Sequence, residues 1–235
     1  MEDIWQTSRP AMAARHDAGL KRHMVGIYRI MALGLFVTGA VAFGVAHTPA
    51  LAAAIFGTPL KWVAMLAPLA FVMFFSFRIE RMTTNGARAA FYGFSALMGV
   101  SLASLFLVFT GISIAQTFLI AATMFGAISL WGYTTNRDIS SWGSFLMMGV
   151  IGVVVASLVN IFLGSTTLHL IVSLVGVAVF VGLTAWDTQR AKSEYLTFAG
   201  TQAAEKLQVM SALGLYLNLI NLFQLLLTFT GQQRD

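Results

Sequence analysis

The chain has 235 residues, of which 58% are hydrophobic and only 10% are charged, and its formal net charge is +5. A soluble domain needs more charge than this to cover its surface, so the composition excludes a soluble globular protein. There is no cysteine, which excludes disulfides, thiol nucleophiles and cysteine metal sites. The basic residues flank apolar stretches, so we expect them to orient the chain in a membrane rather than to bind nucleic acid.

The first segment, residues 1–24, is polar and basic. It lacks the apolar core and the small-residue cleavage site of a signal peptide, so we expect a retained cytoplasmic tail. Such a tail suits either an anchor to anionic lipid or a regulatory contact. Its basic residues are Arg9, Arg15, Lys21 and Arg22.

Long apolar stretches fill the chain from residue 25 to residue 231, and each is about 18 residues or more, the length that crosses hydrocarbon. They predict one all-α integral membrane domain, followed by a short tail at 232–235. Short connections at Thr110–Ile112 and Leu163–Leu168 predict tight antiparallel pairs. The seven predicted spans are 25–46, 60–77, 89–109, 112–132, 142–163, 168–187 and 209–230.

The basic residues between the spans are distributed unevenly. Because lysine and arginine collect in cytoplasmic loops, the bias predicts a cytoplasmic N-terminus and, with seven spans, a C-terminus on the outside. Only Lys61 and Arg234 lie on the outer side. The inner side carries the four basic residues of the tail together with Arg78, Arg81, Arg88, Arg137, Arg190, Lys192 and Lys206.

Small residues recur every four positions in the third span, at Ser95, Gly99 and Ala103. Such a row lets two helix backbones approach closely in lipid. We interpret it as a packing surface rather than a site.

Asp187 stands at the end of the sixth apolar stretch, whereas the other acids lie in polar tails or loops. A carboxylate inside hydrocarbon is costly, so an acid here is a candidate functional residue. Two interpretations remain open. Asp187 either lies at the headgroup boundary, solvated or paired with Arg190, or faces the interior of the bundle and lines an ion or proton path.

The last span carries Asn218, Asn221 and Gln224 at helical spacing. Carboxamides in lipid need partners, so this stripe predicts either structural hydrogen bonds or the polar wall of a pore. Asn218 meets Asp187 only if the sixth helix continues to about Tyr195 or the seventh starts late. Arg78 and Arg81 could supply Asp187 with a counter-charge, although a membrane anchor explains them equally.

Enzyme signatures are weak, so we expect no catalytic site. Ser95 lies near the inner end of the third span and His169 at the outer end of the sixth, so the two side chains are too far apart to act as a nucleophile and its base. The last span contains neither the second carboxylate of an aspartyl protease nor a lysine for retinal. The four histidines are scattered and form no metal-ligand cluster, so we expect no cofactor and no metal site.

A set of motifs in the second half of the chain resembles the Bax inhibitor-1 family, also called the transmembrane BAX inhibitor motif family, and in particular its YbhL/YccA-type bacterial branch. The first half agrees mainly in its helix pattern. The motifs are Met124–Ala127, Trp131–Thr135, Asp138–Gly143, Ala185–Gln189 and Leu215–Phe223.

The resemblance implies seven transmembrane helices, with the last helix central and the other six around it, in a bacterial inner membrane. It also implies a proton-sensitive calcium leak in which two aspartates, on the sixth and seventh helices, share a proton. Asp187 matches the first aspartate, but Asn218 stands where many members carry the second.

This departure has a physical consequence, because an Asp–Asn pair lacks the repulsion that splits the titration of two carboxylates. We therefore expect a pH-modulated Ca²⁺ or cation leak gated near Asp187, with a weaker or shifted pH response and weaker direct Ca²⁺ binding. The alternative is a non-conducting regulator that binds other membrane proteins, such as a membrane-anchored AAA protease, a role that the resemblance suggests for some bacterial relatives.

Overall fold

The computed structural model describes residues 3–234, and it describes side chains for residues 17–75, 77–79, 81–201 and 203–234. Arg9 and Arg15 of the predicted tail lie outside the described side chains. The described part of the chain is mostly helical and contains no strand, only an isolated bridge between Phe109 and Gln233. The helices are α1 (Asp3–Ala46), α2 (Pro49–Phe56), α3 (Leu60–Arg78), η1 (Ile79–Arg81), α4 (Thr84–Val108), α5 (Gly111–Thr134), α6 (Trp142–Leu163), α7 (Thr166–Phe198) and α8 (Gln202–Thr230).

The predicted all-helical membrane architecture is confirmed at this level. Six of the described helices are each long and apolar enough to cross a membrane: α1, α4, α5, α6, α7 and α8. The short helix α2 and helix α3 meet at an angle of 82°, and they make a seventh span only if the bent pair counts as one.

Helices α1, α7 and α8 extend furthest beyond the predicted spans on the side where the basic residues collect. Helix α1 begins at Asp3, within the predicted tail, and α8 begins at Gln202 rather than near residue 209. Helix α7 continues to Phe198, eleven residues past the predicted end at 187. Hydropathy finds only the part of a helix that lipid covers, which is why these polar continuations were missed.

Polar residues at the short connections explain where several helices start. The hydroxyls of Thr83, Thr110 and Ser165 accept hydrogen bonds from the first turns of α4, α5 and α7. Gly164 ends α6 with a φ of 60°, a left-handed conformation that glycine adopts without strain.

The two short connections have different outcomes. Helices α6 and α7 pack against each other, as predicted. In contrast, α4 packs chiefly against α1, and α5 packs chiefly against α7 and α8, so the expected tight pair of α4 and α5 is wrong. A short loop fixes where two helices meet but not the angle at which they diverge.

Close contacts between helices follow the small residues. A Cβ atom at Gly99 on α4 would lie 2.6 Å from the carbonyl oxygen of Thr38 on α1. Ser95 and Ala103 of the same row are fully buried, which agrees with the packing interpretation. On α5, a Cβ atom at Gly132 would lie 2.5 Å from the carbonyl oxygen of Ala185 on α7.

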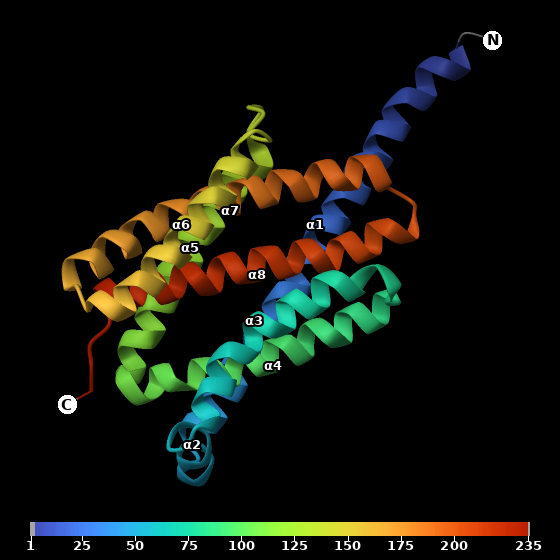
Figure 1. The fold of residues 1–235 in the computed structure, drawn as a ribbon. Coiled ribbons are helices and arrows are strands. Elements are labelled where there is room, and N and C mark those ends of the chain that lie inside the picture. The colour runs from blue at the N-terminus through green and yellow to red at the C-terminus, as the bar shows by residue number, and fades with distance from the viewer. Residues whose placement is uncertain (1–2, 235) are drawn as a thin grey trace.

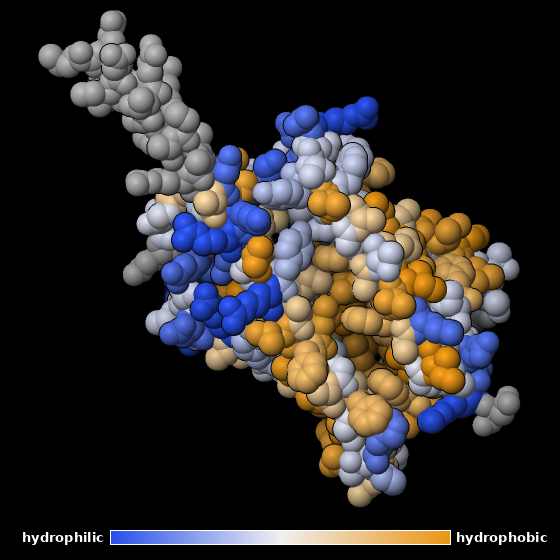
Figure 2. All heavy atoms as spheres, turned by 180° about the vertical axis from the view of Figure 1, so that it is seen from behind, coloured by the Kyte–Doolittle hydropathy of each residue, from blue (hydrophilic) through white to orange (hydrophobic). Residues whose placement is uncertain are grey.

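Helix α8 is the most enclosed of the candidate spans, because 56% of its most apolar window is buried, compared with 6% for α6. It packs against α1, α4, α5 and α7, and Figure 1 shows it running among them. Figure 2 shows apolar side chains over the middle of the opposite view and hydrophilic groups gathered toward the edges. This pattern suits a lipid-facing belt between two polar ends.

Candidate functional site

Asp187 and Asn218 lie face to face between α7 and α8. The Asn218 carboxamide Nδ2 donates a hydrogen bond to Asp187 Oδ2 over 2.7 Å. Asn218 is only 4% exposed, and Asp187 is half-buried. The structure therefore brings together the two residues that the sequence singled out, through the continuation of α7 beyond Tyr195.

Gly214 makes room for the Asp187 carboxylate. It lies one turn before Asn218 on α8, on the same face, and a Cβ atom there would lie 3.5 Å from Asp187 Oδ2. An alanine at this position would therefore be in van der Waals contact with the carboxylate, and a larger side chain would compete with it for space.

A second acid on α7, Glu194, faces the same seam and was missed by the sequence analysis. It lies seven residues, or two helical turns, after Asp187, and its side chain is only 18% exposed. Its Oε1 accepts a hydrogen bond from Arg190 Nε at 2.7 Å, and the Ser211 hydroxyl of α8 lies 3.5 Å from its Oε2. Its i, i+7 spacing from Asp187 is the pattern that indicates a shared helix face, but a helix predicted to end at residue 187 does not include Glu194.

His23 of α1 is the next titratable side chain beyond Glu194. It is 7% exposed, its ring centroid lies 4.9 Å from that of Tyr195, and its Nε2 has no hydrogen-bond partner among the described residues. Asp187, Glu194 and His23 thus form a row of titratable groups along the extended end of α7.

The loop between α5 and α6 is fastened to α7 by residues on either side of Asp187. Gln189 accepts a hydrogen bond from the Ile139 backbone at 2.9 Å and donates one to the Arg137 carbonyl at 2.8 Å. Trp186 Nε1 donates to the Ser140 carbonyl at 3.1 Å. Movement of this loop would therefore displace or strain the turn of α7 that carries Asp187.

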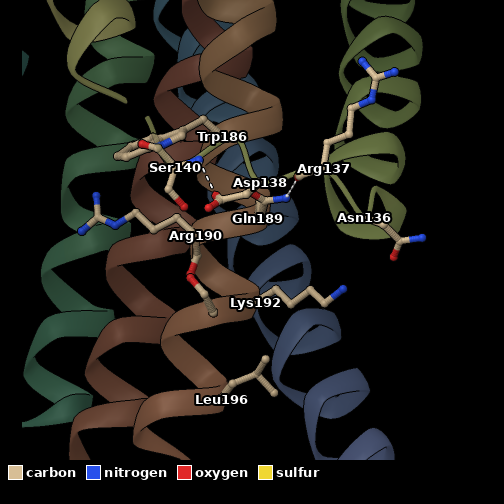
Figure 3. Close-up of a pocket in the computed structure, with 10 residues that line it drawn as sticks. Asn136, Arg137, Asp138, Ser140, Trp186, Gln189, Arg190, Lys192 and Leu196 are labelled. Carbon is tan, nitrogen blue, oxygen red and sulfur yellow. Dashed lines mark hydrogen bonds between the residues drawn. The ribbon is translucent and has the colours of Figure 1, made fainter. Parts of the chain in front are cut away.

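A polar pocket of about 370 Å³ lies between this loop and α7 (Figure 3). Arg190 and Lys192 extend to opposite sides of α7 in Figure 3, so the pocket is not a cluster of converging cations. Asp138 in the loop is fully exposed, and hydrogen bonds from the side chain and backbone of Ser140 lower the pKa of its carboxyl group. The lining residues are Asn136, Arg137, Asp138, Ser140, Trp186, Gln189, Arg190, Lys192, Ser193 and Leu196.

The other predicted supporting groups do not contact Asp187. Asn221 donates to the Leu217 carbonyl of its own helix at 2.8 Å, and Arg190 pairs with Glu194 while its guanidinium lies 5.3 Å from the Trp186 ring. Arg78 and Arg81 are exposed, and neither pairs with Asp187 among the described side chains. The suggested Asp187–Arg190 pair is therefore not formed.

Metal ligands do not converge in the described part of the chain, where no three histidine, aspartate or glutamate side chains could hold one ion together. The seam between α7 and α8 can instead accept or release protons at carboxylates next to neutral donors. A cation passing there would meet carboxylate and carboxamide oxygens, the ligands that hard cations prefer.

Comparison with known proteins gives consistent matches over nearly the whole chain. Residues 20–235 match the family described as inhibitor of apoptosis-promoting Bax1. The chain is 44% identical to an uncharacterised protein of Rickettsia prowazekii, over 93% of each chain. It is 43% identical to an uncharacterised protein of Caulobacter vibrioides, over 93% of this chain and 92% of that one. It is also 42% identical to the inner membrane protein YbhL of Escherichia coli K12, over 92% of this chain and 94% of that one.

Proposed function

This chain belongs to the Bax inhibitor-1 family, and from that premise we propose that it is a multi-pass inner-membrane protein that conducts cations, Ca²⁺ among them, through a leak gated at Asp187. The inner-membrane location follows the name of its Escherichia coli relative. The observation that carries the proposal is the 2.7 Å hydrogen bond between Asn218 and Asp187, on two membrane-spanning helices.

We place the N-terminus in the cytoplasm, because Lys21, Arg22, Arg78, Arg137 and Arg190 all belong to one end of the helices. Seven spans, with the bent pair α2 and α3 as the second, then put the C-terminus outside. In this arrangement α8 is the central helix and the other six spans surround it, which its burial supports.

The gate works through the protonation state of Asp187. The ionised carboxylate accepts the Asn218 donor and ties α7 to α8, whereas the protonated form can itself donate to the Asn218 carbonyl oxygen. The two states differ by one charge near the end of the apolar stretch of α7, where a charge costs less than the roughly 2.5–3.5 kcal/mol that it costs at the centre of a span. A free-energy difference of this order shifts the populations of a two-state gate.

The charged and titratable groups along the seam set the pH dependence. Arg190 lies one turn from Asp187 but pairs with Glu194, so its charge is largely neutralised there. His23 lies beyond Glu194 on α1. Because Asn218 is neutral, Asp187 titrates without a carboxylate directly opposite, and we expect a shallower pH response than two facing aspartates would give.

Calcium flux into liposomes tests the proposal. The native protein should conduct with a shallow response between about pH 6 and pH 8, and Asn218→Asp should make that response steeper. Asp187→Asn should remove most of the pH dependence. Asn221→Asp is the matched control, since its side chain bonds to its own helix rather than to Asp187.

A steep response in the native protein that Asn218→Asp does not sharpen would contradict the proposal. Equal effects of Asn218→Asp and Asn221→Asp would do so too.

The alternative class is a non-conducting regulator that binds a membrane protein such as a membrane-anchored AAA protease. The polar pocket beside Asp187, lined by exposed Arg137 and Asp138, is the feature that favours it. Purified regulator would move no ion in any variant, and Arg137→Ala would weaken partner binding. Flux that depends on Asp187 would exclude this alternative.

A further inference from the structure

A second and larger cavity lies between α1 and α5. It has a volume of about 650 Å³, within the range of about 300–1,000 Å³ that small-molecule sites occupy. Its walls are mainly apolar. They include Met24 and Val25 of α1 and Phe125, Gly126 and Leu130 of α5.

One end of this groove is positively charged. Lys21 lines it and is exposed, and no described side chain forms an ion pair with it. Tyr133 lines the same groove, and Lys192 lies 5.3 Å from its ring on the α7 side, while donating to the Tyr133 carbonyl at 3.1 Å. Lys21 and Tyr133 both lie where their helices reach the basic side of the membrane domain, the depth at which lipid headgroups lie.

The deep end of the groove has hydroxyl groups, but they are already satisfied by the protein. The Tyr28 hydroxyl bonds to Ser129, and Ser129 bonds to Thr188 at 2.9 Å. Thr188 in turn donates to the Thr184 carbonyl at 2.7 Å. A polar ligand would find no unpaired hydroxyl group here, and a hydrocarbon chain would leave no hydroxyl group without its hydrogen bond.

Gly126 leaves the wall of the groove open. A Cβ atom at this position would have no atom within 4 Å, so α5 presents bare backbone to the cavity there. From Lys21 to Tyr28 the groove spans seven residues of α1, about 10 Å along the helix axis. It is therefore long enough to hold a stretch of extended hydrocarbon below a charged end.

We propose that the groove between α1 and α5 binds an anionic phospholipid of the cytoplasmic leaflet. The phosphate group lies at Lys21, and an acyl chain runs past Met24 and Leu130 to Gly126. The charge complementarity at Lys21 selects the anionic headgroup, since basic pockets between spans on this side favour such lipids. The hydroxyl groups of Tyr28 and Ser129 are already hydrogen-bonded within the protein, so the deep end of the groove favours an acyl chain over a polar group.

Native mass spectrometry on protein released from bilayers of equal phosphatidylglycerol and phosphatidylcholine tests this site. The native protein should retain phosphatidylglycerol in preference to phosphatidylcholine. Lys21→Gln should reduce that preference about fivefold, the equivalent of about 1 kcal/mol for one basic residue. Arg22→Gln, which removes a neighbouring exposed charge outside the groove, should leave the preference unchanged.

The second part of the experiment fills the groove with a bulky side chain. Gly126→Phe should lose bound lipid of either class, whereas Gly152→Phe on α6 should not. Gly152 is a matched control because it is also an exposed helical glycine with no atom within 4 Å of its Cβ position. The exposed position of Lys21 keeps the test decisive even if Gly126→Phe does not fold.

Three results would overturn the proposal. These are equal retention of the two lipids by the native protein, equal losses in Lys21→Gln and Arg22→Gln, or unchanged lipid in folded Gly126→Phe. None of these results depends on whether the protein conducts ions, so the site and the proposed leak stand or fall separately.

Discussion

The bond between Asn218 and Asp187 should contribute measurably to the stability of the fold. Asn218→Leu keeps the branching and the heavy-atom count of the side chain and removes its donor, which leaves a half-buried carboxylate without that partner. Losing a hydrogen bond to a charged group costs about 1.5–3 kcal/mol in general. Hydrogen bonds between membrane helices average about 0.6 and reach about 1.7 kcal/mol. Because this bond is short and Asn218 is 4% exposed, we expect a coupling near the upper membrane value, about 1.5 kcal/mol.

A double-mutant cycle measures that coupling directly. Unfolding free energies are compared in bicelles for the native protein, Asn218→Leu, Asp187→Leu and the double variant. A control cycle uses Asn221→Leu in place of Asn218→Leu. The Asn221 carboxamide bonds to the Leu217 carbonyl of its own helix, so its coupling to Asp187 should be less than about 0.3 kcal/mol. A coupling at Asn218 no larger than that at Asn221 would refute the reasoning.

Three further outcomes are expected. Gly132→Ala should destabilise the protein by about 1–3 kcal/mol because its Cβ would meet the Ala185 carbonyl at 2.5 Å, while Gly126→Ala on the same helix should be nearly neutral in the same unfolding assay. Gln189→Leu should speed amide hydrogen exchange of residues 136–140, since both hydrogen bonds to the loop are lost, and Gln189→Glu, which keeps the acceptor for Ile139, should have a smaller effect. Ser140→Ala should raise the Asp138 pKa back toward 3.8 in a carbon NMR titration, because the native shift is downward. Any stabilisation linked to that shift is present above the ordinary pKa and is lost as the pH falls through the lowered value.

The predicted site was partly recoverable from the sequence. Asp187 and Asn218 were visible as polar residues in apolar surroundings, because a group that is costly in lipid is rarely placed there without a partner. Glu194 was invisible because it lies in a polar stretch that hydropathy assigns to a loop, although α7 carries it to the same face as Asp187. Arg190 forms its ion pair with Glu194, which lies at i+4 from it on the same helix, rather than with Asp187.

The fold shows the same division. The sequence by itself determined that the chain is a bundle of apolar helices, because composition and the length of apolar stretches follow from the thickness and polarity of a bilayer. It also determined the packing row at Ser95, Gly99 and Ala103, because the spacing of residues on one helix face is a local property.

Only the tertiary structure decided which helices meet. Helix α4 packs on α1 rather than on its neighbour α5, and the extension of α7 to Phe198 sets the register in which Asp187 reaches Asn218. The groove between α1 and α5 likewise arises where two helices distant in the sequence fail to close together. Such features depend on the crossing angles of whole helices, which are fixed by side chains from several segments at once and leave no pattern in any one of them.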